Sequence, residues 1–178
     1  AFGDLDFVRE AMPVMEDIID WYRNGTDFSI AREEDGLIRA GAGFDQVTWM
    51  DVRIGDVLPT PRHGKPVEIN AYWYNDLKIM ACFSNLLGGT KARAYEELSA
   101  KVRDSFRRQF WNERMGCLRD VVSGNPYDDQ IRCNQIWAVS VPFGMLEAKE
   151  ERQVLDTVFE HLYTPYGLRS LSPQDPEF

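Results

Sequence analysis

The amino-acid sequence predicts an all-α fold in which deeply buried helices alternate with half-exposed ones. Three observations support this. Five segments repeat apolar residues at helical spacing. Some of these segments carry polar residues along one face, whereas others carry very few. Long irregular stretches join several of them. The pattern is typical of inner and outer helices arranged in a ring, with the loops, and therefore the functional site, at one end.

The first two helices are expected at residues 4–23 and 66–87. Asp4 is a suitable N-cap for the first helix. Pro66 suits the first position of the second helix, where its missing N–H costs nothing. The second helix has few polar positions, so we expect it to be deeply buried.

Three further helices are expected at residues 90–111, 134–146 and 148–162. Thr90 and Asn134 are the predicted N-caps of the first two. The first of the three has charges on one side and apolar residues on the other, which predicts an outer helix. Acidic residues at the start of the last helix complement its dipole.

Residues 26–66 show no helical period. A short β-hairpin is expected near their start, where apolar residues flank the turn sequence at 33–36. A stretch this long without a helix is usually functional in a compact domain. We find no internal boundary and interpret residues 1–178 as a single domain fragment.

Composition excludes several classes of partner. The net charge of −9 opposes binding to nucleic acid or anionic membranes. There is also no apolar run of about 18 residues that would predict a membrane span. Three scattered cysteines and two distant histidines predict neither a disulfide framework nor a metal site, and no cofactor is expected. These features favour a cytoplasmic protein with a neutral ligand.

Asp51 is the first candidate for chemistry. It follows an apolar segment, and Trp49 lies two residues before it. In an extended segment both side chains would point to the same side, with an indole to cover a sugar ring and a carboxyl to reach an oxygen. Apolar neighbours would favour the protonated carboxyl that glycosidic bond cleavage requires. The alternative is an ordinary turn aspartate.

Other polar residues could hold sugar hydroxyls. Glu68 and Asn70 lie at the expected start of a helix, although Glu68 could simply complement the helix dipole. Asn134 could equally be a cap, and Arg169 a surface charge. Loop charges such as Asp45 and Asp120 cannot be assigned from spacing. The candidate substrate-binding residues are Trp49, Arg62, Glu68, Asn70, Asn134, Gln135 and Arg169.

Four stretches together resemble the C-terminal glucosidase region of bacterial and archaeal glycogen debranching enzymes, and they occur in that family's order. They are DGLIRAG at 35–41, QVTWMDVRIGDVLPTPRHGKPVEINAYWYN at 46–75, NQIWAVSVPFGML at 134–146 and YTPYGLRSLSPQDP at 163–176. The second stretch is long and specific. The resemblance covers most of the chain.

The resemblance implies a partial (α/α)6 toroid and inverting hydrolysis of α-1,6-linked glucose at the branch points of glycogen or a branched α-glucan. It implies that Asp51 is the general acid. The general base is expected beyond Phe178, so this fragment is expected to be inactive alone. Inner helix faces left uncovered could make it self-associate.

Two alternatives stay open. The chain could belong to another toroid enzyme, such as a trehalase-like protein or a different α-glucosidase. It could also be a non-catalytic carbohydrate-binding module or a helical interaction domain, which would use the same aromatic residues without a pair of catalytic carboxylates.

Overall fold

A computed structural model describes residues 3–122 and 129–178. Over these residues the chain is mostly helical. The helices are α1 (Leu5–Asn24), α2 (Val67–Leu86), α3 (Ala92–Phe110), the short 3-10 helix η1 (Cys133–Ile136), α4 (Trp137–Ser140) and α5 (Ala148–Leu162). In the part of the chain that the structure describes, no helix is both long and apolar enough to span a bilayer.

Short strands pair as antiparallel two-stranded sheets beside the helices. The pairs are β1 (Ala31–Arg32) with β2 (Ile38–Arg39), β3 (Lys65–Pro66) with β6 (Val121–Val122), β4 (Trp111–Asn112) with β5 (Cys117–Leu118), and β7 (Tyr163–Thr164) with β8 (Gly167–Leu168). The pair β1–β2 is the predicted hairpin. Three further two-stranded sheets occur among the described residues. Their strands are only two residues long, too short to show an alternating pattern.

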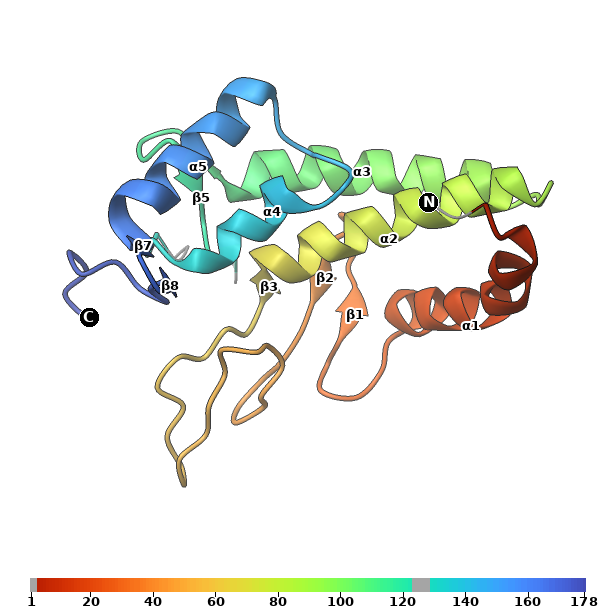
Figure 1. Ribbon diagram of the computed structural model, residues 1–178. Coiled ribbons are helices and arrows are strands. Elements are labelled where there is room, and N and C mark those ends of the chain that lie inside the picture. Colours follow the sequence, from red (N-terminus) through yellow and green to blue (C-terminus); the bar gives the residue numbers. More distant parts are fainter. Residues whose placement is uncertain (1–2, 123–128) are drawn as a thin grey trace.

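Helices α2 and α3 run side by side and form the centre of the core (Figure 1). As predicted, α2 is buried along most of its surface. Its buried residues are Val67, Glu68, Asn70, Ala71, Trp73, Tyr74, Asn75, Leu77, Met80, Ala81 and Ser84. Helix α3 is amphipathic and buries one face, where the rings of Phe106 and Phe110 stack with centroids 4.5 Å apart.

The helix caps agree only partly with the sequence. The carboxylate of Asp4 accepts a hydrogen bond from the Phe7 N–H at 2.9 Å, which confirms the predicted cap of α1. Thr90 does not cap α3, because the N-cap position is Lys91 and no side chain bonds there. Pro66 lies just before α2, in β3, and is its N-cap residue.

The predicted helix at 134–146 is right only as far as Ser140. One turn of η1 leads into one turn of α4, and the chain then leaves helical geometry at Val141, which is extended. Two physical causes account for this. Val141 precedes Pro142, which disfavours the helical region for the preceding residue. In addition, the Asn134 side chain does not cap a helix and bonds a distant carboxylate.

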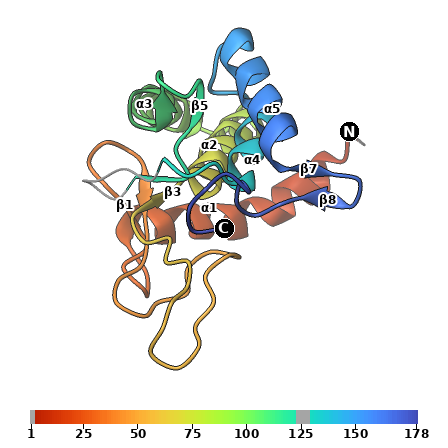
Figure 2. The same ribbon diagram turned by 90° about the vertical axis from the view of Figure 1, so that its left-hand side faces the viewer.

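The loop between β2 and β3 extends well away from the helices and lies at the same end of the molecule as β7, β8 and the C-terminus (Figures 1 and 2). The described helices do not close into a ring (Figure 2). The start of α2, the long loop and the segment before α4 therefore meet at one end, as the sequence predicted for the site.

Candidate functional site

A pocket of about 790 Å³ lies where the long loop, the first turns of α2 and the η1–α4 segment meet. Its lining residues come from four separate parts of the chain. They are Gln46, Val47, Thr48, Trp49, Glu68, Ile69, Tyr72, Cys133, Ile136, Trp137 and Leu168. Its size is within the usual range for small-molecule sites, which is about 300–1,000 Å³.

Aromatic side chains form much of the pocket wall. Trp49 lines the pocket, and 64% of its surface is exposed to solvent. Tyr72 and Trp137 form a tilted pair, with ring centroids 5.7 Å apart and planes at 52°. Exposed aromatic faces in a pocket can cover the apolar face of a sugar ring, while polar groups nearby bind its hydroxyls.

Asp51 closes a turn beside this wall. Its N–H donates to the Thr48 carbonyl at 3.2 Å. Its carboxylate accepts the N–H groups of Val47 and Thr48 at 3.0 and 2.8 Å on one oxygen, and that of Arg62 at 2.9 Å on the other. The expectation of an extended segment is therefore wrong, because these bonds fold the chain back. Asp51 is 5% exposed and does not line the pocket.

Arg62 lies at the centre of a buried ion cluster with Glu68 and Asp120, and all three residues are at most 2% exposed. The guanidinium donates to Asp120 through Nε at 2.7 Å and Nη2 at 3.2 Å. It donates to both Glu68 oxygens, through Nη1 and through Nη2, the latter at 2.7 Å. Burial alone would lower the pKa of Arg62, but the bonds and charges of the two carboxylates outweigh burial and raise it.

Asn134 extends this cluster to the pocket wall. Its amide donates to Asp120 Oδ1 at 2.8 Å, and its carbonyl oxygen accepts the indole N–H of Trp49 at 2.8 Å. The Arg132 guanidinium lies near the cluster, with Nε 3.9 Å from Asp120 Oδ2. The structure thus brings together Trp49, Asn134 and the ion cluster, and Glu68 itself reaches the pocket.

Two predicted binding residues serve the backbone. The side chain of Asn70 accepts the Ile38 N–H at 2.7 Å and donates to the Ile38 carbonyl at 3.1 Å. The Gln135 side chain accepts the Leu118 N–H and donates to the Arg132 carbonyl, both at 3.2 Å. Both side chains are essentially fully buried. They position the walls of the site, and neither lines the pocket.

Arg169 lies apart from the ion cluster. It is exposed at the end of the β7–β8 hairpin, and its Nη1 is 3.5 Å from the Tyr163 carbonyl oxygen. Its neighbour Leu168 does line the pocket. Arg169 itself does not line the pocket.

Sequence reasoning missed Tyr72 and Trp137 as pocket residues and left Asp120 unassigned. Tyr72 could have been found, because it lies four residues after Glu68 and so on the same helix face. No local signal marks Asp120, whose partner Arg62 is 58 residues away. Within residues 3–122 and 129–178, no group of three or more histidine, cysteine, aspartate or glutamate side chains could hold a metal ion.

The fold belongs to a class found in glycosidases. A solved structure named "Sialidase" matches with a TM-score of 0.77 and 18% identity, over 99% of this chain and 15% of that one. A GH78 family rhamnosidase of Bacillus sp. GL1 matches with a TM-score of 0.66 and 16% identity, over 99% of this chain and 16% of that one. At these identities the likeness concerns the fold alone.

The family follows from the sequence itself. The model of the family described as "Amylo-alpha-1,6-glucosidase" matches residues 1–178, so the chain belongs to that family of glycoside hydrolase domains. No curated protein matches the chain. The chain spans about one sixth of the length of the two solved structures, and it therefore corresponds to part of a glycosidase domain.

Proposed function

We propose that this chain supplies one wall of the active site of an enzyme that hydrolyses α-1,6-linked glucose at the branch points of an α-glucan such as glycogen. The observation that carries the proposal is the aromatic pocket, built from the same segments that resemble debranching enzymes. Trp49, Tyr72 and Trp137 would cover sugar faces. Glu68, which also lines the pocket, would accept hydrogen bonds from sugar hydroxyls.

In this proposal the surrounding architecture is part of an (α/α)6 toroid, and the reaction inverts the anomeric centre. Asp51 is the proposed general acid, which gives a proton to the leaving oxygen while a second carboxylate activates water. Both Asp51 oxygens accept backbone N–H groups in the structure. Proton donation therefore requires the turn to release at least one of these bonds when substrate binds.

One observation favours a second candidate for the chain alone. Glu68 is the single carboxylate among the described residues that line the pocket, and Arg62 holds both of its oxygens. Such a site can bind sugar without cleaving it. By itself the 178-residue chain would then act as a carbohydrate-binding module.

The test uses Asp51→Asn in a protein that carries the complete glucosidase domain around this segment. We expect glucose release from a branched limit dextrin to fall by about 10²–10⁴-fold, the usual contribution of a general acid. Hydrolysis of α-glucosyl fluoride should be largely retained, because fluoride leaves without a proton. If Asp51 only shaped the turn, both reactions would fall together, and the proposed role would be wrong.

Asp45→Asn is the matched control. Asp45 lies in the same loop, and its carboxylate also accepts a backbone N–H, from Ala42 at 2.9 Å. We expect this variant to change the two rates in parallel and by much less. A selective loss of dextrin hydrolysis in Asp45→Asn would transfer the acid role away from Asp51.

A further inference from the structure

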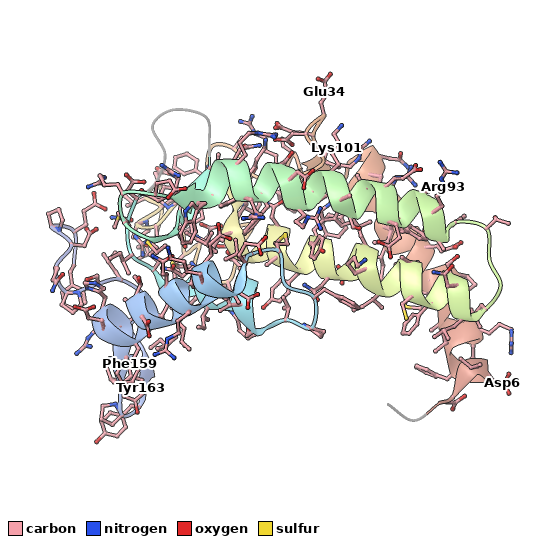
Figure 3. The ribbon with its side chains drawn as sticks, turned by 90° about the horizontal axis from the view of Figure 1, so that it is seen from above. Asp6, Glu34, Arg93, Lys101, Phe159 and Tyr163 are labelled. Atoms are coloured by element: carbon pink, nitrogen blue, oxygen red, sulfur yellow. The ribbon has the colours of Figure 1, made fainter. Side chains whose placement is uncertain are left out.

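A stacked aromatic pair projects from the surface next to the pocket. Phe159, near the end of α5, and Tyr163, the first residue of β7, have ring centroids 5.0 Å apart and planes at 21°. Their exposed fractions are 64% and 52%. Figure 3 shows both side chains pointing away from the body of the molecule, side by side. We call these two residues the aromatic pair.

Strand register connects the aromatic pair to the pocket. Tyr163 is directly opposite Leu168 in the β7–β8 hairpin. In antiparallel strands, directly opposed side chains lie on the same face. Leu168 lines the pocket. Tyr163 therefore lies on the hairpin face that continues from the pocket wall, and Phe159 extends that surface outwards.

The chemistry of the surface suits a neutral polyhydroxylated chain. The rings offer flat apolar area, and the exposed Arg169 beside them can donate to hydroxyl groups from its position near the Tyr163 carbonyl oxygen. The net charge of −9 disfavours polyanions. A glucan chain has apolar ring faces with hydroxyl edges, which matches this combination.

We propose that the aromatic pair is an outer binding site for an α-glucan, occupied by glucose units several residues away from the unit held in the pocket. The proposal rests on the proposed function, since the pocket must hold the end of the same chain. It assigns to Phe159 and Tyr163 a preference for longer chains, with no part in bond cleavage.

The test compares maltoheptaose with maltose as ligands of the 178-residue chain by isothermal titration calorimetry. Tyr163→Ala and Phe159→Ala should weaken maltoheptaose binding by about threefold to tenfold, the range expected for losing an aromatic stacking contact. Maltose affinity should stay unchanged. Tyr166→Ala is the matched control, because Tyr166 is fully exposed at the tip of the same hairpin. It should leave both affinities unchanged.

Three results would overturn the proposal: unchanged maltoheptaose binding in Tyr163→Ala, an equal loss for both ligands, or the same loss in Tyr166→Ala.

Sedimentation velocity on the same variants detects the competing use of the surface, contact with a second copy. A shift from dimer to monomer in Tyr163→Ala without any change in sugar affinity would show that the aromatic pair contacts a second copy of the chain and not a glucan. If the unsubstituted chain binds neither sugar, the proposed function fails as well. If Trp49→Ala weakens the binding of both ligands and the other variants do not, the pocket binds sugar and the outer site is ruled out.

Discussion

Replacing Arg62 by methionine should destabilise the protein far more than any surface charge change. Arg62 is the cation between two buried carboxylates, those of Glu68 and Asp120. Methionine replaces the aliphatic part of the arginine side chain but has no charge and no N–H donors. Arg62→Met would leave two carboxylates without their shared cation in a region almost closed to water, with Arg132 Nε remaining 3.9 Å from Asp120 Oδ2.

The size of the stability loss follows from the number of hydrogen bonds that Arg62 makes and from the burial of its partners. Breaking a buried ion pair by removing one partner costs about 3–5 kcal/mol. Here one substitution removes the partner of two carboxylates, so we expect the free energy of unfolding to fall by at least about 4 kcal/mol. Domains are stable by about 5–15 kcal/mol, and the variant should therefore be close to its unfolding threshold.

Urea denaturation followed by circular dichroism measures this change. Arg39→Met is the control, because Arg39 forms a single exposed bridge to Glu33 at 3.4 Å. It should cost no more than about 1 kcal/mol. Adding Glu68→Gln and Asp120→Asn to Arg62→Met removes the uncompensated charges and should restore more than half of the lost stability. A cost below about 1 kcal/mol for Arg62→Met, or a triple variant no more stable than the single one, would refute the reasoning.

Two further predictions test neighbouring features. A double-mutant cycle between Trp49→Phe and Asn134→Leu should give a coupling free energy of about 1 kcal/mol through their hydrogen bond, and additivity of the two costs would contradict that bond. Burial raises the pKa of Asp76 to about 6 from 3.8, so this carboxyl opposes folding as the pH rises between these values. Apolar side chains such as Ile18, Ile79 and Met80 surround the base of this carboxyl, but part of Asp76 still reaches solvent, so the effect should be small. Asp76→Asn should therefore raise Tm slightly at pH 7 and leave it unchanged near pH 3. The control is Asp17→Asn, which replaces an exposed carboxylate on α1 and should change Tm at neither pH.

The long helices could be predicted because their apolar period extends over several turns. The predicted range of α5 matches the structure, and that of α2 differs by one residue at each end. The segment after Asn134 could not be predicted, because its conformation depends on contacts with distant residues. Asn134 bonds Asp120 and Trp49. A local cap pattern cannot compete with two such bonds in a buried site.

The sequence predicted only part of the site, for a related reason. An amide within a buried helix needs hydrogen-bond partners, and Asn70 is such an amide. Sequence does not say whether the partner is a ligand or the backbone, and here it is Ile38. Trp49 and Glu68 do line the pocket. What distinguishes Glu68 from Asn70 is the direction of one helix face, which depends on the packing of α2.

The buried contacts explain why residues far apart in the chain form one wall. Arg62 uses its backbone N–H to hold Asp51 and its guanidinium to hold Glu68 and Asp120. Asp120 holds Asn134, which in turn holds the indole of Trp49, and Trp49 lies inside the turn that the Thr48–Asp51 bond closes. The contacts form a closed circuit that begins and ends in the Asp51 turn. Loosening any member should therefore alter Trp49 and Asp51 together. In the proposed reaction, sugar contact at the indole would then be coupled to release of the Asp51 carboxylate.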